Sequence, residues 1–167
     1  TTTLTLGALN DQGIAKTLTF INNGTSTVNG VVTLAAGAGS LFEGTVVNIT
    51  GGLHAGVTLN SNATTALGRF TEVTIGGNSR LNVGAAQVLA SLSGSGTVSA
   101  SGAFVLTIGN ADSAVALNTE FTGALINGTG TLGVTKSGLG TLTLSGTNTY
   151  SGLTVVNGGV LVLGSAS

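Results

Sequence analysis

The chain has 167 residues, of which 29 are Gly, and a formal net charge of −1 at pH 7. Only 5% of its residues are charged, which excludes most helical proteins, because exposed helix faces are built from Glu, Lys and Arg. Four Lys or Arg residues give no basic surface for nucleic acid or an anionic membrane. A hydrophobic fraction of 41% argues against disorder, and the absence of Cys excludes disulfides and thiolate metal sites.

Apolar and polar residues alternate in many short stretches bounded by Gly, Asn or Ser, a pattern typical of strands. Thr, Val, Leu and Ile fill these stretches, as β-propensity favours. In chain order, the predicted strands are Thr3 to Leu6, Thr17 to Ile21, Val31 to Leu34, Val46 to Ile49, Val57 to Leu59, Thr71 to Ile75, Arg80 to Val83, Val88 to Leu92, Phe104 to Ile108, Ala124 to Ile126, Thr131 to Val134, Thr141 to Leu144, Thr154 to Val156 and Val160 to Leu163. No run approaches the ~18 apolar residues of a membrane helix.

Self-similarity along the chain distinguishes a solenoid from a sandwich or barrel. The stretch from Gly140 to Gly146 recurs as Gly159 to Ser165, and a Gly-x-Gly-Thr-aliphatic signature begins at Gly94, Gly128 and Gly138. We therefore predict that residues 1–167 form one all-β segment, a right-handed parallel β-helix (single-stranded solenoid) of about eight coils with roughly 20 residues each. Five side chains near the C-terminal end are expected to point inward as aliphatic columns: Leu142, Leu144, Val155, Leu161 and Leu163.

Residues 134 to 164 closely resemble the autotransporter-associated β-strand repeat, also called the passenger-associated transport repeat. The family's Lys-x-Gly-x-Gly-Thr-Leu-x-Leu block is present as Lys136 to Leu144, its Asn-Thr-Tyr-Ser-Gly block as Asn148 to Gly152, and its closing segment as Thr154 to Gly159. Two positions depart from the family pattern, Leu153 and Val160. The residues taken as the structural motif are Lys136, Gly138, Gly140, Thr141, Leu142, Leu144, Gly146, Asn148, Tyr150, Gly152, Val155, Gly158 and Leu161.

The resemblance implies a passenger of a Gram-negative type V secretion protein, located outside the cell or on its surface. Its partner would be an outer-membrane β-barrel of the same polypeptide, beyond Ser167. The repeat would support secretion, because coils that fold first outside the cell can template later coils and oppose back-sliding. The alternative is an adhesin whose polar faces bind host glycans, other cells or sister chains.

Catalysis is not expected, and neither is a cofactor or a metal. His54 could form a triad with Asp11 or Asp112 and a Ser, but no nucleophile-elbow motif surrounds any Ser. The carboxylates are scattered along the chain, so they would form a sugar-cleaving site only if the coils brought them together. These acids are Asp11, Glu43, Glu72, Asp112 and Glu120.

Three further patterns are interpreted as ordinary structure. Gly128, Gly130 and Gly133 match the dinucleotide fingerprint, but no helix is expected after them, so they are interpreted as corner glycines. The turn at Gly76 to Ser79 lacks the Asp of calcium-binding solenoids. Repeated Thr-x-Thr pairs are similar to ice-binding arrays but suit any solvated strand face.

Two motif residues have expected structural roles. Asn148 is expected to hydrogen-bond the backbone at a corner, and Tyr150 is expected to cover the end of the core.

Overall fold

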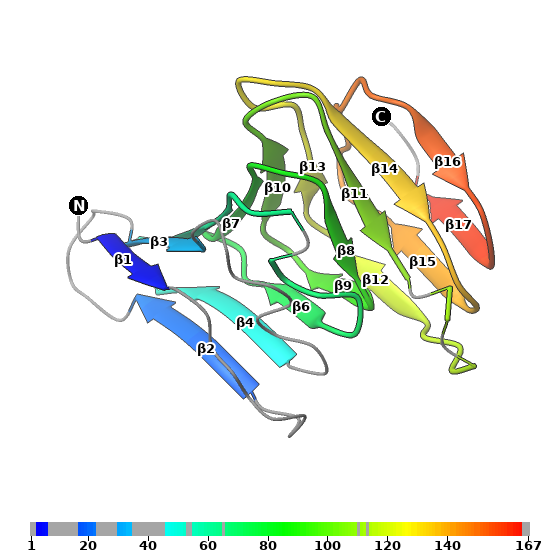
Figure 1. Cartoon of the computed structure of the whole chain (residues 1–167), viewed down its shortest axis with the longest axis horizontal. Coiled ribbons are helices and arrows are strands. Elements are labelled where there is room, and N and C mark those ends of the chain that lie inside the picture. Colours follow the sequence, from blue (N-terminus) through cyan, green and yellow to red (C-terminus); the bar gives the residue numbers. More distant parts are fainter. Residues whose placement is uncertain are drawn as a thin grey trace.

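The computed structural model describes residues 3–6, 17–22, 30–34, 46–52, 55–64, 66–109, 111–112 and 114–164. Within them all regular structure is strand, in three sheets whose pairings are all parallel. Figure 1 shows the strands stacked from the N-terminal end to β16 and β17 at the other end. None of these residues forms a helix long and apolar enough to cross a membrane.

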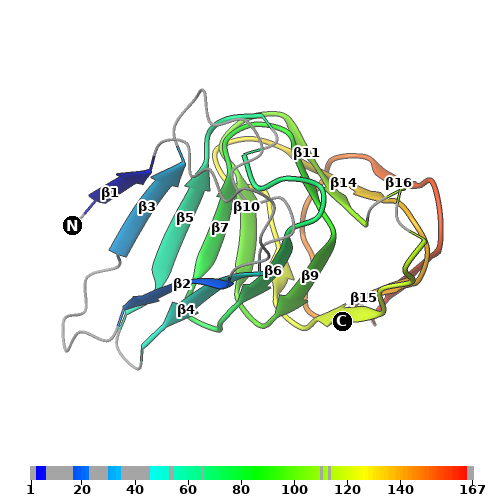
Figure 2. The ribbon, with the colours of Figure 1, turned by 60° about the horizontal axis from the view of Figure 1, so that its bottom comes forward.

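Sheet 1 contains six described strands, and Figure 2 shows most of them side by side. Its order is β1 (Thr3–Leu6), β3 (Gly30–Leu34), β5 (Val57–Ser61), β7 (Arg80–Val83), β10 (Thr97–Ala100) and β13 (Ala124–Leu125). Sheet 2 runs β8 (Gln87–Leu89), β11 (Phe104–Ile108), β14 (Leu132–Lys136) and β16 (Thr154–Val156). Sheet 3 runs β2 (Thr17–Asn22), β4 (Val46–Gly51), β6 (Glu72–Ile75), β9 (Ser91–Gly94), β12 (Thr119–Phe121), β15 (Thr141–Leu144) and β17 (Val160–Leu163).

The described strands β1 to β6 alternate between sheets 1 and 3, and the chain then passes through all three sheets, so each strand pairs with strands one circuit away. From β7 to β15 the order is sheet 1, sheet 2, sheet 3, repeated three times. This arrangement is compatible with the predicted solenoid and differs from a sandwich, whose sheets are antiparallel. The predicted stacking of the two similar stretches is confirmed, because Thr141 pairs with Val160 and Leu144 with Leu163.

The number of residues in one circuit of the chain varies more than the predicted coil length of roughly 20 residues implies. Leu81 pairs with Val98 after a short circuit, whereas Leu18 pairs with Val47 after a much longer one. The Gly-x-Gly-Thr-aliphatic signature also leads into three different sheets, because β10, β14 and β15 follow its three copies. A glycine turn before a strand is therefore a feature of corners in general, not of one fixed position in the circuit.

The core consists of aliphatic columns that run along the stack. Val32, Leu59, Leu81, Val98 and Leu125 are in register on sheet 1, and all are buried. Each such side chain contributes roughly 1.5–3 kcal/mol by leaving water. The prediction of inward columns is confirmed for Leu142 and Leu144, which are buried in the same way on sheet 3.

Leu163 lies in an inward column as predicted, but its side chain is 60% exposed. It pairs with Leu144 and so continues an inward column, but no strand among the described residues stacks on the far side of β17. Leu161 and Val155 are half-buried for the same reason.

Six predicted strands have the observed bounds, and most of the others differ by one or two residues at an end. Val88 to Leu92 was predicted as one strand, but it is two, β8 and β9, separated by a corner at Ala90. Leu89, Ala90, Ser91 and Leu92 are all buried, so burial continues without a break across a corner that a small side chain permits. The prediction missed β10, which contains one large aliphatic residue, and β12, which contains Glu120.

Candidate functional site

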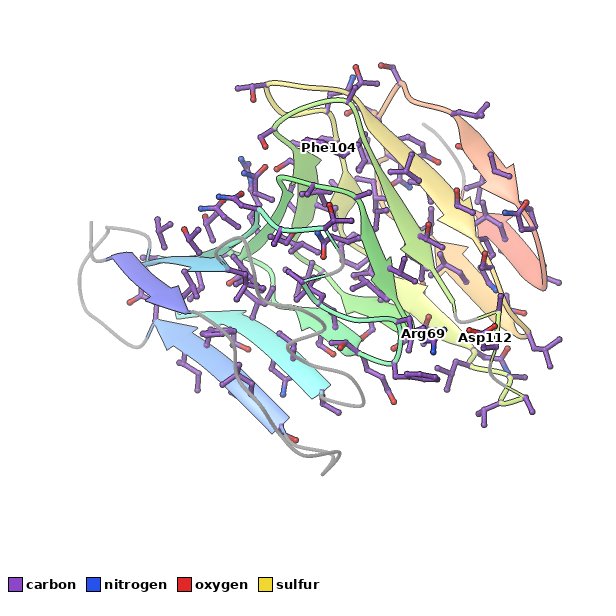
Figure 3. All side chains as sticks on the ribbon, in the orientation of Figure 1. Arg69, Phe104 and Asp112 are labelled. Carbon is purple, nitrogen blue, oxygen red and sulfur yellow. The ribbon has the colours of Figure 1, made fainter. Side chains whose placement is uncertain are left out.

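The groups considered for catalysis are not assembled into a site among the described residues. His54, Asp11 and Glu43 lie outside those residues. Asp112 forms an ion pair with Arg69 at 2.5 Å, and both side chains are more than half exposed. Figure 3 shows these two residues next to each other at the edge of the stack. A pair this exposed contributes little to stability.

The remaining described carboxylates lie on different strands of sheet 3. Glu72 is on β6, and Glu120 on β12 accepts a hydrogen bond from Ser145 Oγ at 2.6 Å. Within the parts of the chain that the structure describes, no three His, Cys, Asp or Glu side chains gather where they could hold a metal ion.

The glycines of the dinucleotide-like pattern precede a strand. Gly128 and Gly130 lie in the turn before β14, as expected of corner residues, whereas Gly133 lies inside β14 and pairs with Val105. The corner interpretation is therefore wrong for Gly133. Its missing side chain leaves room for the next coil, since a Cβ there would lie 3.3 Å from Leu153 O.

In the turn at Gly76 to Ser79, the side-chain amide of Asn78 donates to Gly52 O at 3.1 Å.

Lys136 is the most unusual polar residue in the resembling segment, because its side chain points into the stack with 2% of its surface exposed. The Nζ atom donates to Ser137 O at 2.5 Å, to Gly138 O at 3.1 Å and to Gly158 O at 3.3 Å. An ammonium has three donors, so these carbonyls satisfy it. Burial lowers the pKa of Lys136 from its ordinary value. Strand β14 extends beyond the predicted end at Val134, because its alternation of inward residues continues to Lys136.

Glycines surround this ammonium where a larger residue would not fit. Gly159 has φ +65°, and a Cβ there would lie 2.8 Å from Lys136 Nζ and 2.3 Å from Gly140 O. Gly138 and Gly140 also have positive φ and turn the chain from β14 into β15. Gly158 supplies the third carbonyl. The spacing of Lys136, Gly138, Gly140 and Gly159 therefore builds one corner of two consecutive coils.

Asn148 and Tyr150 lie at the opposite corner of the segment. Asn148 Oδ1 accepts from the backbone N–H of Leu125 at 3.0 Å, and its Nδ2 donates to Gly146 O at 2.8 Å. Asn148 thus completes sheet 1 where β13 ends. Tyr150 packs against the core and shares a hydrogen bond of 2.8 Å with Thr154 Oγ1.

The other motif residues occupy strand and turn positions around these two corners. Thr141 N donates to Asn118 Oδ1 at 2.8 Å, Val155 pairs with Thr135, and Leu161 pairs with Leu142. Gly146 and Gly152 lie close to the backbone of the preceding coil, at Gly123 and Leu132 respectively.

A hollow of about 200 Å³, which sequence reasoning missed, opens at the corner between sheets 2 and 3. It arises because the coil of β8 and β9 turns at Ala90 alone, whereas Phe70 and Val115 lie on longer turns of neighbouring coils. Its rim is apolar, with Phe70, Val115 and Leu139 exposed, while Lys136 lies in its wall with its donors already used. No short motif marks it, because its shape depends on differences in turn length.

No curated protein and no solved structure matches this chain. The family model described as the passenger-associated transport repeat matches residues 134–163, the segment that contains both corners. The resemblance seen in the motif is thereby confirmed, and this segment is a repeat of the kind found in autotransporter passengers.

Proposed function

We propose that this chain is a non-catalytic structural segment of an autotransporter passenger, which supports secretion and directional folding at the surface of a Gram-negative cell. The observation that carries the proposal is the placement of the repeat: residues 134–163 form the C-terminal strands of the described stack, and their strands β14 and β15 pair with β11 and β12 of the preceding coil. A folded repeat therefore offers a complete edge to the coil that precedes it in sequence.

The physical mechanism is stepwise addition of coils. Strand pairings link each coil to the next one in the stack. The stability of the stack therefore comes from contacts between neighbouring coils, as in other repeat proteins. In the proposed order, the coil of β16 and β17 folds first outside the cell, and β14 and β15 then dock on it. Each docking step buries aliphatic side chains such as Leu142 and Leu144, and this burial opposes return of the chain through the membrane.

Two finer features of the fold belong to this proposal. We take the helix to be right-handed, because connections between parallel strands of one sheet have that hand in about 98% of cases. We propose about eight coils, and the described residues of sheet 3 supply seven strands toward this number. The complete reading frame is expected to encode a signal peptide before this segment and a translocator barrel after it.

Secretion of the complete protein from its bacterial cell tests the proposal. Leu142→Asn/Leu144→Asn introduces two amides into the inward columns, whereas the matched control Thr141→Asn/Thr143→Asn introduces the same amides on the outward face of the same strand. We expect surface display to fall strongly for the inward pair and to stay near wild type for the outward pair. Equal display of the two variants, measured by protease accessibility on whole cells, would refute the secretion role.

Adhesion is a second candidate function, favoured by a polar row on the outward face of sheet 3. Thr19, Asn48 and Thr74 are in register there, and Thr74 Oγ1 lies 3.0 Å from Ser93 Oγ. Farther along the same sheet, Glu120 pairs with Thr143. Hydroxyls and amides at strand spacing can hydrogen-bond sugars. Binding of the chain to a glycan array, abolished by Thr74→Val/Ser93→Val, would support this function, and no binding would remove it.

A further inference from the structure

The strands of the repeat do not by themselves determine how they align. Strand β15 reads Thr-Leu-Thr-Leu and strand β17 reads Val-Leu-Val-Leu. A slip of one residue would turn the leucines outward, but a slip of two residues would keep every leucine inward, because side chains alternate with period two. Another element must select the observed pairing of Thr143 with Val162 over its slipped alternatives.

The ammonium of Lys136 is placed to make this selection. Two of its acceptors, Ser137 O and Gly138 O, belong to its own corner, but the third, Gly158 O, belongs to the next coil. The backbone of Lys136 makes a contact of the same kind, since its carbonyl accepts from Asn157 N at 2.8 Å. These contacts join residues 136 and 157–158 in one relative position only.

The surroundings of the ammonium also restrict its position. A Cβ at Gly109, in the coil before, would lie 3.3 Å from Nζ, and a Cβ at Gly159, in the coil after, would lie 2.8 Å from it. One side chain is thus enclosed by glycines from both neighbouring coils. No carboxylate of the described residues forms an ion pair with Lys136, so carbonyl oxygens alone compensate its charge. A slipped register would withdraw Gly158 O and leave a buried ammonium with an unused donor, which is costly.

We propose that Lys136 acts as a register lock, a positioning residue that fixes the alignment of the coil of β14 and β15 on the coil of β16 and β17. The lock selects one alignment among several that the aliphatic pattern permits. This inference concerns the folded chain in solution and holds whether or not the segment serves secretion.

Introduced cysteines can report the alignment directly, because the chain contains no native Cys. The pair Thr143→Cys/Val162→Cys reports the native register, since paired residues on neighbouring strands lie ~4.8 Å apart, within disulfide reach. The pairs Thr143→Cys/Val160→Cys and Thr141→Cys/Val162→Cys report slips of two residues in either direction. In the native register these two pairs are diagonal, ~7–8 Å apart, and cannot close without movement.

In the Lys136→Met background, which keeps the side-chain length but removes the charge and donors, we expect the slipped disulfides to increase about tenfold or more, the factor that one charge-assisted hydrogen bond carries. The matched control is Val134→Ala, a buried inward position on the same strand, which weakens packing but leaves the lysine contacts intact. It should give only the native disulfide. A purely structural role of Lys136 would make the two variants behave alike.

Lys136→Gln, which keeps an amide donor without charge, decides the question if the Met variant does not fold; circular dichroism checks folding. The proposal is supported if a folded variant at position 136 forms slipped disulfides and Val134→Ala does not. It is overturned if the folded variants at position 136 form only the native disulfide. It is equally overturned if both of them fail to fold while Val134→Ala folds, because Lys136 would then be needed for folding itself.

Discussion

The middle coils, residues 57 to 100, and the repeat, residues 134 to 163, are each held to their neighbouring coils by polar side chains, but by different ones. In the middle coils, buried Gln87 accepts from Leu67 N at 3.2 Å and donates to Ala63 O at 2.7 Å. Asn82 donates to Asn60 Oδ1 at 3.0 Å across neighbouring strands. In the repeat, the corresponding links between coils come from Lys136 and Asn148.

This difference explains why only one of the two regions has a recognisable sequence. Gln87 serves one long turn of irregular shape, so its role depends on the residues that happen to surround it. Lys136 and Asn148 bond backbone groups at two glycine-lined corners, and such contacts need only a fixed spacing along the chain. A pattern of single residues at fixed spacing can recur from coil to coil, whereas a network built around one turn cannot.

The largest expected effect separates packed columns from exposed ones within the repeat. Leu144→Ala should lower the free energy of unfolding by about 2–5 kcal/mol, because it opens a cavity between coils on both sides. Leu163→Ala, in register on the next strand but 60% exposed, should cost about 0.5 kcal/mol or less. Urea denaturation followed by circular dichroism measures both. Similar losses would show that the end of the stack is covered in solution.

A smaller effect is expected from the network of the middle coils. Gln87→Ala leaves the Leu67 N–H and the Ala63 carbonyl without their partner, which should cost about 1–3 kcal/mol. The amide of Leu67 should also exchange with solvent faster. Thr74→Ala removes only an exposed hydroxyl contact and serves as the control. If hydrogen exchange at Leu67 were unchanged in the Gln87 variant, the assigned role of the network would be wrong.

Asn148 provides the matching change in the repeat. Asn148→Ala removes its bonds to Leu125 N and Gly146 O, and we expect a loss of about 1 kcal/mol, because the site is only partly buried. Asn157→Ala, at an exposed position of the following turn, should be nearly neutral. A loss for Asn157 as large as that for Asn148 would contradict the corner role given to Asn148 alone.

Much of the fold was predictable because strand alternation and glycine turns are local signals. Thr141 to Leu144 and Arg80 to Val83 were predicted with the observed bounds, since each alternates cleanly between Gly or Ser boundaries. The corner at Ala90 was not, because the buried pattern continues through it and only the three-dimensional path shows the change of sheet.

The candidate site was predictable only in part, for a related reason. The motif named Lys136 and the glycines, but a lysine on a strand is normally exposed, and only the carbonyls of residues 137, 138 and 158 explain its burial. The hollow beside it could not be predicted, because it depends on the unequal turns that contain Ala90 and Val115.

The smallest expected effect is a pH dependence that compares Lys136 with its apolar replacement. Burial lowers the pKa of Lys136 below its ordinary value of 10.5, so between the two values the unfolded chain binds more protons than the folded chain. Stability from this group therefore rises as pH increases through that window. Lys136→Met lacks this titrating amine but shares every other titrating group with the wild type. The wild type should therefore gain stability relative to this variant on going from neutral pH toward pH 10.5. Thermal unfolding of both proteins across this range measures the difference. If the wild type instead lost stability relative to Lys136→Met as the pH rose, the three carbonyls would stabilise the ammonium more than burial destabilises it.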